Sequence, residues 1–373
     1  MRLDRVNITS VRNLGKVQIS GLRQTNVFFG TNGSGKTSFL EALHILGVAR
    51  SFRTHKIKTV VSRGESGCTV YGERAPSSRE GRVAIGVRRD LDGSYQIRID
   101  GRNVASTAEL AAHLPVLCVN ADSFNLFLAG PASRRKYLDW SVFHVEQLFY
   151  PAWKKYQRCI KQRNTILRRD KLDRASLAAW SAELAEAGET LSELRRTHFD
   201  GLRPLFVTLA RELSDSLEGI DVGFSRGWDA TRSLAEVLES GEASDIDRGF
   251  TQSGPHRADL RIKLNGINAV DILSRGQMKL AICALTLAQG SLLGELTGRS
   301  CMYLVDDLPS ELDMLHRELF CRILANLGSQ VFVTCVNYED VSALWPDTAE
   351  VAVFHVEHGE VTPFEVGHLI NLD

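Results

Sequence analysis

One stretch near the start of the chain has the residue types and spacing of a phosphate-binding loop. It matches the pattern G-x-x-x-x-G-K-[ST] and reads Gly30-Thr31-Asn32-Gly33-Ser34-Gly35-Lys36-Thr37. The glycines let successive backbone N–H groups turn toward a phosphate, and the following helix adds partial positive charge. We expect Lys36 to reach the β- and γ-phosphates of ATP and Thr37 to ligate Mg²⁺. We call residues 30–37 the P-loop.

A pair of carboxylates forms the second candidate group. Asp306 and Asp307 end an apolar run over residues 301–305 that is predicted to be a strand. Beside a P-loop, Asp306 would hold Mg²⁺ through water, and Asp307 would be the general base nearest the attacking water. Together with Lys36 these two form the predicted catalytic group. A purely structural role for Asp307, capping the next segment, stays open.

A third segment resembles the L-S-G-G-Q signature of ABC-type ATPases. It follows Leu273, lies 32 positions before Asp306, and consists of Ser274, Arg275, Gly276 and Gln277. Residues 310–313 resemble the D-loop of that superfamily. The resemblance implies that the signature of one subunit caps ATP bound by the other, in an ATP-dependent homodimer. Arg275 replaces the first paired glycine, and it either adds charge near phosphate or faces solvent.

The order and spacing of these motifs, with further matching stretches, resemble the RecF family of compact, SMC-like bacterial proteins. The P-loop lysine and the signature serine are 238 positions apart, more than in transporter ATPases and far less than in SMC or Rad50 proteins. Residues 130–140 resemble the family's G-x-P-x-x-R-R-x-[FY]-L-D segment, and residues 254–259 resemble its G-P-H-R-x-D segment. Residues 11–14 and 50–54 also fit, so the resemblance runs from residue 2 to about residue 335.

This resemblance implies an ATP-dependent DNA-binding protein of recombinational repair and replication restart. The implied partners are double-stranded and gapped DNA, the proteins RecR and RecO, and functionally the recombinase RecA. Two departures concern hydrolysis: Cys335 stands where ABC ATPases carry a switch histidine, and Asp307 stands where they carry a glutamate. We therefore expect a weak DNA-dependent ATPase, slower than about 10 s⁻¹, that uses hydrolysis for release.

The elements that must position these residues alternate between strand and helix at both ends of the chain. Strand patterns lead into the P-loop and a helix over residues 37–48, and strand–helix alternation returns after residue 249. Between them the apolar period is about 3.6, and a turn near residues 169–175 predicts an antiparallel helical hairpin with a kink at Pro204. The predicted fold is α/β: an ABC-type ATPase head of mixed sheet and antiparallel β portion, with an inserted α-helical arm. The predicted domains are residues 1–121 and 249–373 for the head and 122–248 for the arm.

The charge distribution predicts a surface for DNA, although the 45 Lys and Arg residues balance 45 Asp and Glu residues. Residues 134–174 carry twelve cations and four acids, and residues 175–245 carry six cations and fourteen acids. A basic stripe can neutralise backbone phosphates, whereas basic and acidic helices that simply pair would be the structural alternative. The candidate DNA contacts are Arg50, Arg53 and Lys56 after the P-loop helix, and Arg134, Arg135, Arg168 and Arg169 in the arm.

The composition argues against disulfide-rich, zinc-binding, membrane-spanning and secreted proteins. The seven cysteines form no C-x-x-C pair, which is typical of reduced thiols rather than of a disulfide or zinc framework. No uninterrupted apolar run reaches the roughly 18 residues of a membrane helix, and the start lacks a signal-peptide core, so we expect a cytoplasmic protein without a membrane partner. Two alternatives stay open: an ABC transporter ATPase subunit, and a DNA clamp that binds ATP without turnover.

Overall fold

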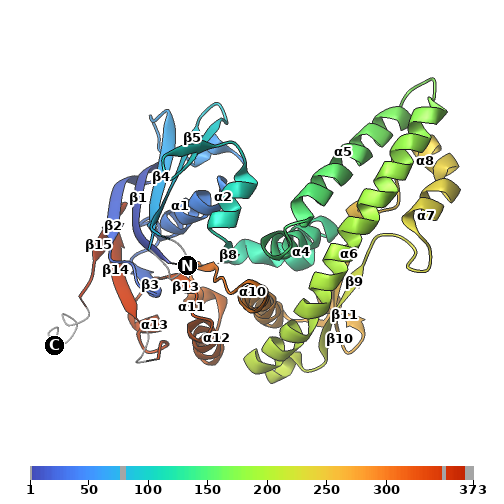
Figure 1. Ribbon diagram of the computed structural model, residues 1–373. Helices are drawn as coiled ribbons and strands as arrows, with labels where there is room; N and C mark the ends of the chain where they lie inside the picture. The colour runs from blue at the N-terminus through green and yellow to red at the C-terminus, as the bar shows by residue number, and fades with distance from the viewer. Residues whose placement is uncertain (1, 76–80, 347–349, 366–373) are drawn as a thin grey trace. The chain divides into compact units, whose positions relative to one another are not determined.

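The computed structural model describes residues 2–75, 81–346 and 350–365. The chain forms two compact units, each assembled from segments that are distant in the sequence (Figure 1). The first unit comprises Met1–Ser123, Glu212–Ser214 and Lys279–Asp373, and the second comprises Phe124–Arg211 and Asp215–Met278.

An antiparallel six-stranded sheet forms one layer of the first unit. Its strand order is β2-β1-β4-β5-β6-β7. Side chains alternate between a buried and a more exposed face along β4, which is the pattern of a sheet covered on one side. The strands are β1 (Leu3–Val11), β2 (Leu14–Ser20), β4 (Gly67–Arg74), β5 (Val83–Asp90), β6 (Tyr95–Ile99) and β7 (Arg102–Val104).

A second six-stranded sheet carries the residues of chemical interest. Its order is β15-β14-β3-β13-β12-β8, and all neighbours are parallel except the terminal hairpin of β14 and β15. Because parallel strands end at the same edge, β3, β12 and β13 deliver the segments that follow them to one place. The strands are β3 (Thr25–Phe29), β8 (Val116–Val119), β12 (Met302–Val305), β13 (Gln330–Cys335), β14 (Val351–Glu357) and β15 (Glu360–Pro363).

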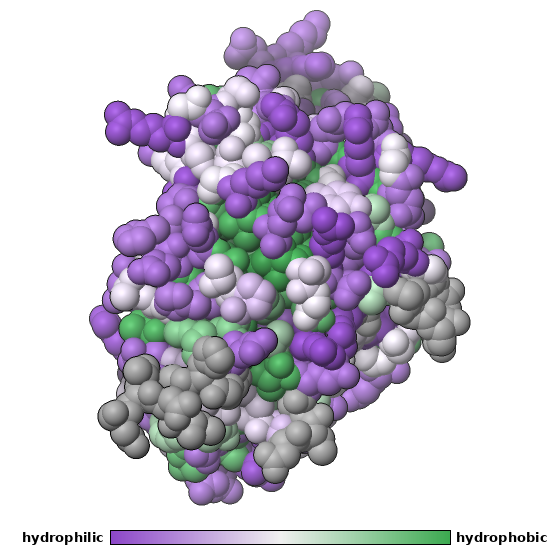
Figure 2. Space-filling view, turned by 90° about the vertical axis from the view of Figure 1, so that its left-hand side faces the viewer, coloured by the Kyte–Doolittle hydropathy of each residue, from purple (hydrophilic) through white to green (hydrophobic). Residues whose placement is uncertain are grey.

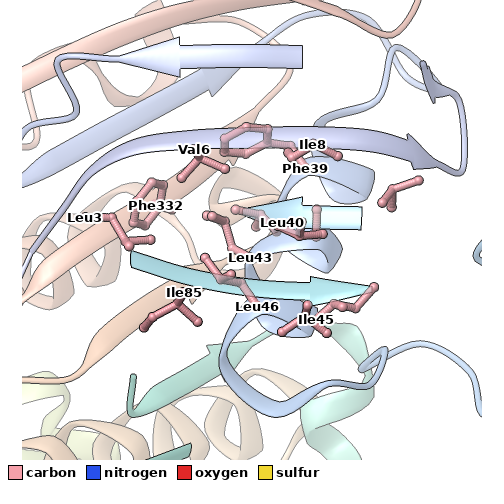
Figure 3. Close-up of a cluster of buried hydrophobic side chains, with 14 of the residues drawn as sticks. Leu3, Val6, Ile8, Phe39, Leu40, Leu43, Ile45, Leu46, Ile85 and Phe332 are labelled. Atoms are coloured by element: carbon pink, nitrogen blue, oxygen red, sulfur yellow. The ribbon is translucent and has the colours of Figure 1, made fainter. Parts of the chain in front are cut away.

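Helix α1 (Lys36–Val48) is buried in the core of the first unit (Figure 3). Phe39, Leu40, Leu43 and Leu46 have no exposed surface, and they pack with side chains of β1, β5 and β13. Truncating one such leucine to alanine costs about 2–5 kcal/mol in a packed core. The P-loop is therefore joined to a helix that cannot shift without disrupting this cluster.

The remaining helices of the first unit surround these sheets. Seen from the side of β2 and β15, the surface is mostly hydrophilic, with hydrophobic residues gathered in a hollow near its middle (Figure 2). The helices are η1 (Ile57–Thr59), α2 (Thr107–His113), η2 (Ala121–Phe124), α11 (Leu308–Glu311), α12 (Met314–Asn326) and α13 (Glu339–Ser342), together with most of α10 (Arg275–Thr297).

The second unit consists of a long helical hairpin and a small sheet. Helices α5 (Phe149–Leu167) and α6 (Arg174–Leu213) are joined by a short turn, and the sheet has the order β11-β10-β9. The other elements are α3 (Asn125–Leu128), α4 (Pro131–Val145), η3 (Asp215–Leu217), β9 (Ile220–Ser225), α7 (Leu234–Ser240), α8 (Glu242–Arg248), η4 (Pro255–Arg257), β10 (Asp259–Leu264), β11 (Ile267–Asn268) and α9 (Ala269–Ile272).

A buried ion pair holds the second unit together. The Arg163 side chain of α5 has no exposed surface, and its guanidinium donates to Asp245 Oδ2 and Thr251 Oγ1, both at 2.7 Å, and to Ser181 Oγ at 2.9 Å. Removing one member of such a pair leaves an uncompensated buried charge, which costs about 3–5 kcal/mol. Three helices and the segment before η4 are thereby fixed to one another.

The predicted α/β fold with an inserted α-helical arm is confirmed. Two-residue turns close two of the strand hairpins, since Asp100-Gly101 joins β6 to β7 and Asn265-Gly266 joins β10 to β11, all four residues with positive φ. Helix α6 is continuous over 40 residues, with Pro204 inside it.

The division of the chain differs from the predicted boundaries after residue 248. Residues 249–278 belong to the second unit, whereas the prediction assigned residues 249–373 to the head. The physical reason is strand pairing: Asp259–Leu264 forms an antiparallel ladder with β9, which follows the arm helices.

Among the residues that the structure describes, one helix is long and apolar enough to cross a membrane by length and composition. This helix is α10, and 72% of its apolar window is buried inside the molecule, as in the core helix of a folded domain. Polar residues such as Gln289 and Glu295 interrupt its apolar sequence, which is why a count of uninterrupted apolar runs does not detect it.

Candidate ATP-binding site

The P-loop connects β3 to α1 and has the backbone of a phosphate cradle. Gly30, Gly33 and Gly35 have φ values of 151°, 82° and 127°, a region that residues with a side chain rarely adopt. A Cβ at Gly30 would lie 2.1 Å from the carbonyl oxygen of Val356, so only glycine fits there.

Lys36 lies inside the loop that precedes it. Its Nζ donates to the carbonyl oxygens of Gly30 at 2.6 Å and Thr31 at 2.9 Å, and the residue is 7% exposed. Burial lowers the pKa of Lys36, against the opposing attraction of Asp307 and Asp306. The ammonium of Lys36 is thus held at a position where it can contact a phosphate bound in the P-loop.

The Ser34 hydroxyl supplies an independent sign that the loop fits a phosphate. Its Oγ is buried and has no hydrogen-bond partner among the described residues. A buried polar atom without a partner costs about 1–3 kcal/mol, and a phosphate oxygen would satisfy it. The residues of the loop therefore fit the phosphates of a nucleotide.

A chain of hydrogen bonds joins the P-loop to the ends of β12 and β13. Thr37 Oγ1 donates to Asp306 Oδ1 at 2.9 Å, and Thr334 Oγ1 donates to the same oxygen at 2.8 Å. The backbone N–H of Asp307 donates to Thr334 Oγ1 at 2.7 Å. Desolvation raises the pKa of Asp306, and the two threonine hydrogen bonds oppose that shift.

These oxygens match the ligand preference of Mg²⁺. The hydroxyl of Thr37 and the carboxylate of Asp306 are already at hydrogen-bond distance, and magnesium takes such ligands together with waters and phosphate oxygens. The described residues contain no cluster of three His, Cys, Asp or Glu side chains around a metal position. A magnesium ion here would accordingly complete its shell with water and phosphate oxygens.

Asp307 and Cys335, the two departures from the ABC pattern, lie at the same edge of the sheet. Asp307 has left-handed backbone angles, φ 51° and ψ 53°, and its side chain makes no capping hydrogen bond to α11. Left-handed backbone costs a residue with a side chain about 1–2 kcal/mol. Burial raises the pKa of the Cys335 thiol to about 12, so this thiol is a neutral group at pH 7.

Asn13 is a supporting residue that the sequence analysis did not assign to the site. Its Nδ2 donates to the carbonyl oxygens of Gly33 at 3.2 Å and Ser34 at 3.0 Å, and its Oδ1 accepts from Ser38 Oγ at 2.9 Å. Asn13 thereby ties the loop to the first turn of α1. The matching stretch at residues 11–14 was the available signal, but its spacing to the P-loop carries no information about contact.

Thr334 is the second residue that sequence reasoning missed. It is 1% exposed and bridges the two carboxylate residues that end β12. In the sequence it is one polar position in an apolar strand, which does not distinguish it from a buried structural threonine.

The signature segment forms the start of α10, in the second unit. Ser274 and Gln277 make reciprocal hydrogen bonds, with Ser274 N donating to Gln277 Oε1 at 2.9 Å and Gln277 N donating to Ser274 Oγ at 3.2 Å. This is the capping-box arrangement at a helix N-terminus. Arg275 and Gly276 are exposed, so backbone donors and one cation face solvent there.

The D-loop segment ends at a helix start in the first unit. Asp313 caps α12 by accepting from His316 N at 3.1 Å. Lys279 Nζ donates to the Ser310 carbonyl at 2.8 Å and lies 3.3 Å from Glu311 Oε2. The segment is thus fixed at both ends.

The candidate DNA contacts fall into two groups. Arg50, Arg53 and Lys56 are exposed in the first unit, and Arg168 and Arg169 are exposed at the turn between α5 and α6. Arg53 Nη1 lies 3.8 Å from Glu41, and Arg168 Nε donates to the Gly249 carbonyl.

Arg134 and Arg135 are instead engaged inside the second unit. Arg134 forms a two-pronged ion pair with Asp259, at 2.7 and 3.1 Å, and its side chain is 15% exposed. Arg135 Nη1 donates to the Ala258 carbonyl at 2.8 Å, and burial lowers its pKa. Both guanidinium groups bind residues at the start of β10, so neither arginine belongs to the proposed DNA-binding surface.

Known proteins resemble this chain along almost its whole length. Residues 2–362 match the family model of the RecF/RecN/SMC N-terminal domain. The DNA replication and repair protein RecF of Pseudomonas fluorescens is 48% identical over 362 residues, which cover 97% of this chain and 98% of the relative. RecF of Pseudomonas aeruginosa is 48% identical over 364 residues, with the same coverage. The chain belongs to the RecF family, as predicted.

Solved structures agree with this assignment. A structure of the recombination mediator protein RecF with ATP, in the RecFOR pathway, has a TM-score of 0.85 and 25% identity, covering 97% of both chains. An SMC head bound to the C-terminal winged-helix domain of ScpA has a TM-score of 0.59 and 15% identity, and shows a shared fold alone. Neither the transporter subunit nor the clamp without turnover is favoured by these relatives.

Proposed function

We propose that this chain is an ATP-dependent DNA-binding protein of recombinational repair and replication restart. The observation that carries the proposal is the hydrogen-bonded chain from the P-loop through Thr37 and Asp306 to Thr334. It is supported by relatives named DNA replication and repair protein RecF at 48% identity along 97% of the chain.

The P-loop residues and Lys36 would hold the phosphates of ATP. The backbone N–H groups at the start of α1 donate to phosphate oxygens, and Lys36 exchanges the carbonyls of Gly30 and Thr31 for the β- and γ-phosphates. Thr37 and Asp306 would hold Mg²⁺, which would neutralise charge on the phosphates. A solved RecF structure with ATP supports the choice of nucleotide.

Asp307 would orient and deprotonate the attacking water. Its left-handed backbone and its N–H bond to Thr334 hold the main chain from which the carboxylate extends. The carboxylate is one carbon shorter than a glutamate, and Cys335 is a neutral thiol in the switch position. Both features favour slow turnover, and we propose a weak ATPase whose rate rises on DNA.

The signature segment would act on ATP held by a second copy. Ser274, Arg275 and Gly276 offer backbone and side-chain donors at an exposed helix N-terminus, which is suited to an anion. ATP would therefore join two copies, and hydrolysis would separate them. We propose a homodimer that forms on double-stranded or gapped DNA.

The proposed DNA contacts are backbone contacts from exposed cations. Arg50, Arg53 and Lys56 in the first unit and Arg168 and Arg169 at the arm turn have the exposure required. Such contacts give steep salt dependence and little base specificity. We further propose RecR and RecO as partners, RecA loading as the outcome, and the cytoplasm as the location. The RecFOR pathway named for the solved relative supports the choice of partners.

Phosphate release measured with and without gapped duplex DNA tests the proposal. We expect a turnover below about 10 s⁻¹ that DNA increases, and loss of both turnover and ATP-dependent DNA binding in Lys36→Met. Lys58→Gln, an exposed cation outside the P-loop, is the matched control. Full DNA-stimulated turnover in Lys36→Met would contradict the assignment of the site.

A further inference from the structure

A small polar cavity lies at the end of α1 opposite the P-loop. Its volume is about 150 Å³, and its polar lining consists of Arg50, Ser51, Thr54, His55 and Arg89, with aliphatic side chains completing the wall. No carboxylate of a described residue lines it. Two arginines and a histidine thus line one cavity whose lining contains no acidic residue.

Arg89 is a lining residue of this cavity with a buried donor. Its Nη1 donates to the carbonyl oxygen of Ala49, the residue that caps the C-terminal end of α1, and so offsets the partial negative charge of that helix end. Its Nε is buried and has no hydrogen-bond partner among the described residues. A buried charged donor without an acceptor is costly, and an anion in the cavity would remove that cost.

The loop that forms the opposite wall is fixed in advance. Ser51 Oγ accepts from the backbone N–H groups of Arg53 at 2.9 Å and Thr54 at 3.1 Å, and donates to Glu41. His44 Nδ1 donates to the Arg50 carbonyl at 2.7 Å. Because these bonds order residues 50–54, an incoming ligand does not have to order the loop.

Glu41, a buried acid that contacts Ser51 of this loop, already has a cationic partner. Glu41 has no exposed side-chain surface and accepts two hydrogen bonds from Arg12, at 2.8 and 2.9 Å. Arg50 and His55 are exposed, and no ion pair engages them among the described residues. The cavity therefore has a net positive lining that solvent can reach.

The cavity is separate from the nucleotide site. Helix α1 has 13 residues, which at 1.5 Å per residue place its two ends about 20 Å apart. A phosphate of ATP held at Lys36 cannot reach Arg89 at the other end. The cavity must take its ligand from elsewhere.

We propose that this cavity binds a phosphate oxyanion, and that its source is a backbone phosphate of duplex DNA. The choice of DNA rests on the proposed function. The Nε of Arg89 donates from below, Arg50 and His55 close over the phosphate from the loop, and the aliphatic wall makes no base contact. The site positions DNA on the first unit without reading its sequence.

The first test compares duplex DNA affinity across salt concentrations for the full chain with ATP. We expect Arg50→Gln and Arg89→Gln each to lower affinity by about tenfold and to reduce the salt slope by about one, as loss of one charge-assisted phosphate contact does. The control Lys58→Gln removes an exposed charge of the nearby η1, from a residue that does not line the cavity. Equal affinities for Arg50→Gln and Lys58→Gln would overturn the DNA assignment, and Arg50, being exposed, can be changed without loss of folding.

The second test probes the cavity without DNA. Inorganic phosphate is titrated into protein labelled with ¹⁵N-arginine, and we expect the Arg89 Nε–H resonance to shift and the shift to disappear in Arg50→Gln. No shift would overturn the oxyanion site itself. A shift with unchanged DNA affinity in the variants would overturn DNA as the source and leave a site for a free anion. If the unsubstituted chain binds no DNA, the proposed function fails, while the phosphate titration still decides the cavity.

Discussion

Thr334→Val removes one hydroxyl from the centre of the candidate site while keeping its shape. The hydroxyl donates to Asp306 Oδ1 at 2.8 Å and accepts from Asp307 N at 2.7 Å, in a residue that is 1% exposed. Valine is close to threonine in volume, so packing around β13 is retained. The substitution therefore isolates the two hydrogen bonds.

The expected cost follows from these two bonds. A hydrogen bond to a charged group contributes about 1.5–3 kcal/mol, and an unsatisfied buried backbone N–H costs about 1–3 kcal/mol. Thr37 still donates to Asp306 in the variant, so this hydrogen bond compensates part of the lost stabilisation. We therefore expect the free energy of unfolding to fall by about 3 kcal/mol. The pKa of Asp306, already raised by burial, should rise further without the Thr334 donor.

Urea unfolding and magnesium-dependent ATP binding measure these two effects. Thr334→Val should lower stability and weaken ATP binding most at low pH, where Asp306 takes up a proton. Thr334→Ser keeps the hydroxyl and should stay within about 1 kcal/mol of the unsubstituted chain. Unchanged stability and unchanged binding in Thr334→Val would refute the bridging role assigned to this residue.

Three other predictions concern the signature, the arm and pH. Ser274→Arg should keep ATP binding but abolish the ATP-dependent dimer in light scattering; loss of ATP binding instead would mean that this serine does not act on a second copy. Charge reversal at Arg168 and Arg169 should lower DNA affinity and flatten its salt slope, and no change would leave the arm with a structural role. Stability should fall as the pH drops from about 6.5 to about 4, because burial lowers three histidine pKa values to about 4 and the unfolded chain then takes up protons first. The three histidines are His44, His198 and His256, and each lowers the free energy of unfolding by up to about 3 kcal/mol over this pH range. A urea-unfolding free energy that does not change over the range would contradict the burial of these side chains.

The local parts of the site were predictable because their signals lie within a few residues. The P-loop is a contiguous pattern, and the helix predicted from residue 37 begins at Lys36. The strand before Asp306 was visible as an apolar run, and the pairing of this run with a P-loop motif predicted that the carboxylate would lie beside the P-loop, where it accepts from Thr37.

Residues with distant partners were not predictable. Arg134 looks like a free cation in a basic segment, but its partner Asp259 is 125 positions away. The boundary after residue 248 was misplaced for the same reason, since β10 pairs with a strand that follows the arm. Asn13 and Thr334 support the site through single hydrogen bonds that no periodicity or spacing records.

Arg89 shows the same limit for the proposed phosphate cavity. It follows the exposed Arg88 in β5, and strand alternation turns the two side chains to opposite faces. Only the fold brings Arg89 to the end of α1, 40 positions away in sequence from Ala49. A cluster of cations in the sequence therefore does not indicate which of them share a cavity.

The molar mass in solution tests the central claim most directly. Light scattering after gel filtration would be run without nucleotide, with ADP, and with ATP and Mg²⁺, on the unsubstituted chain and on Lys36→Met. The account predicts a change from monomer to dimer with ATP alone, and none in Lys36→Met. A monomer under every condition would contradict the proposal that the signature segment of one copy completes the ATP site of another.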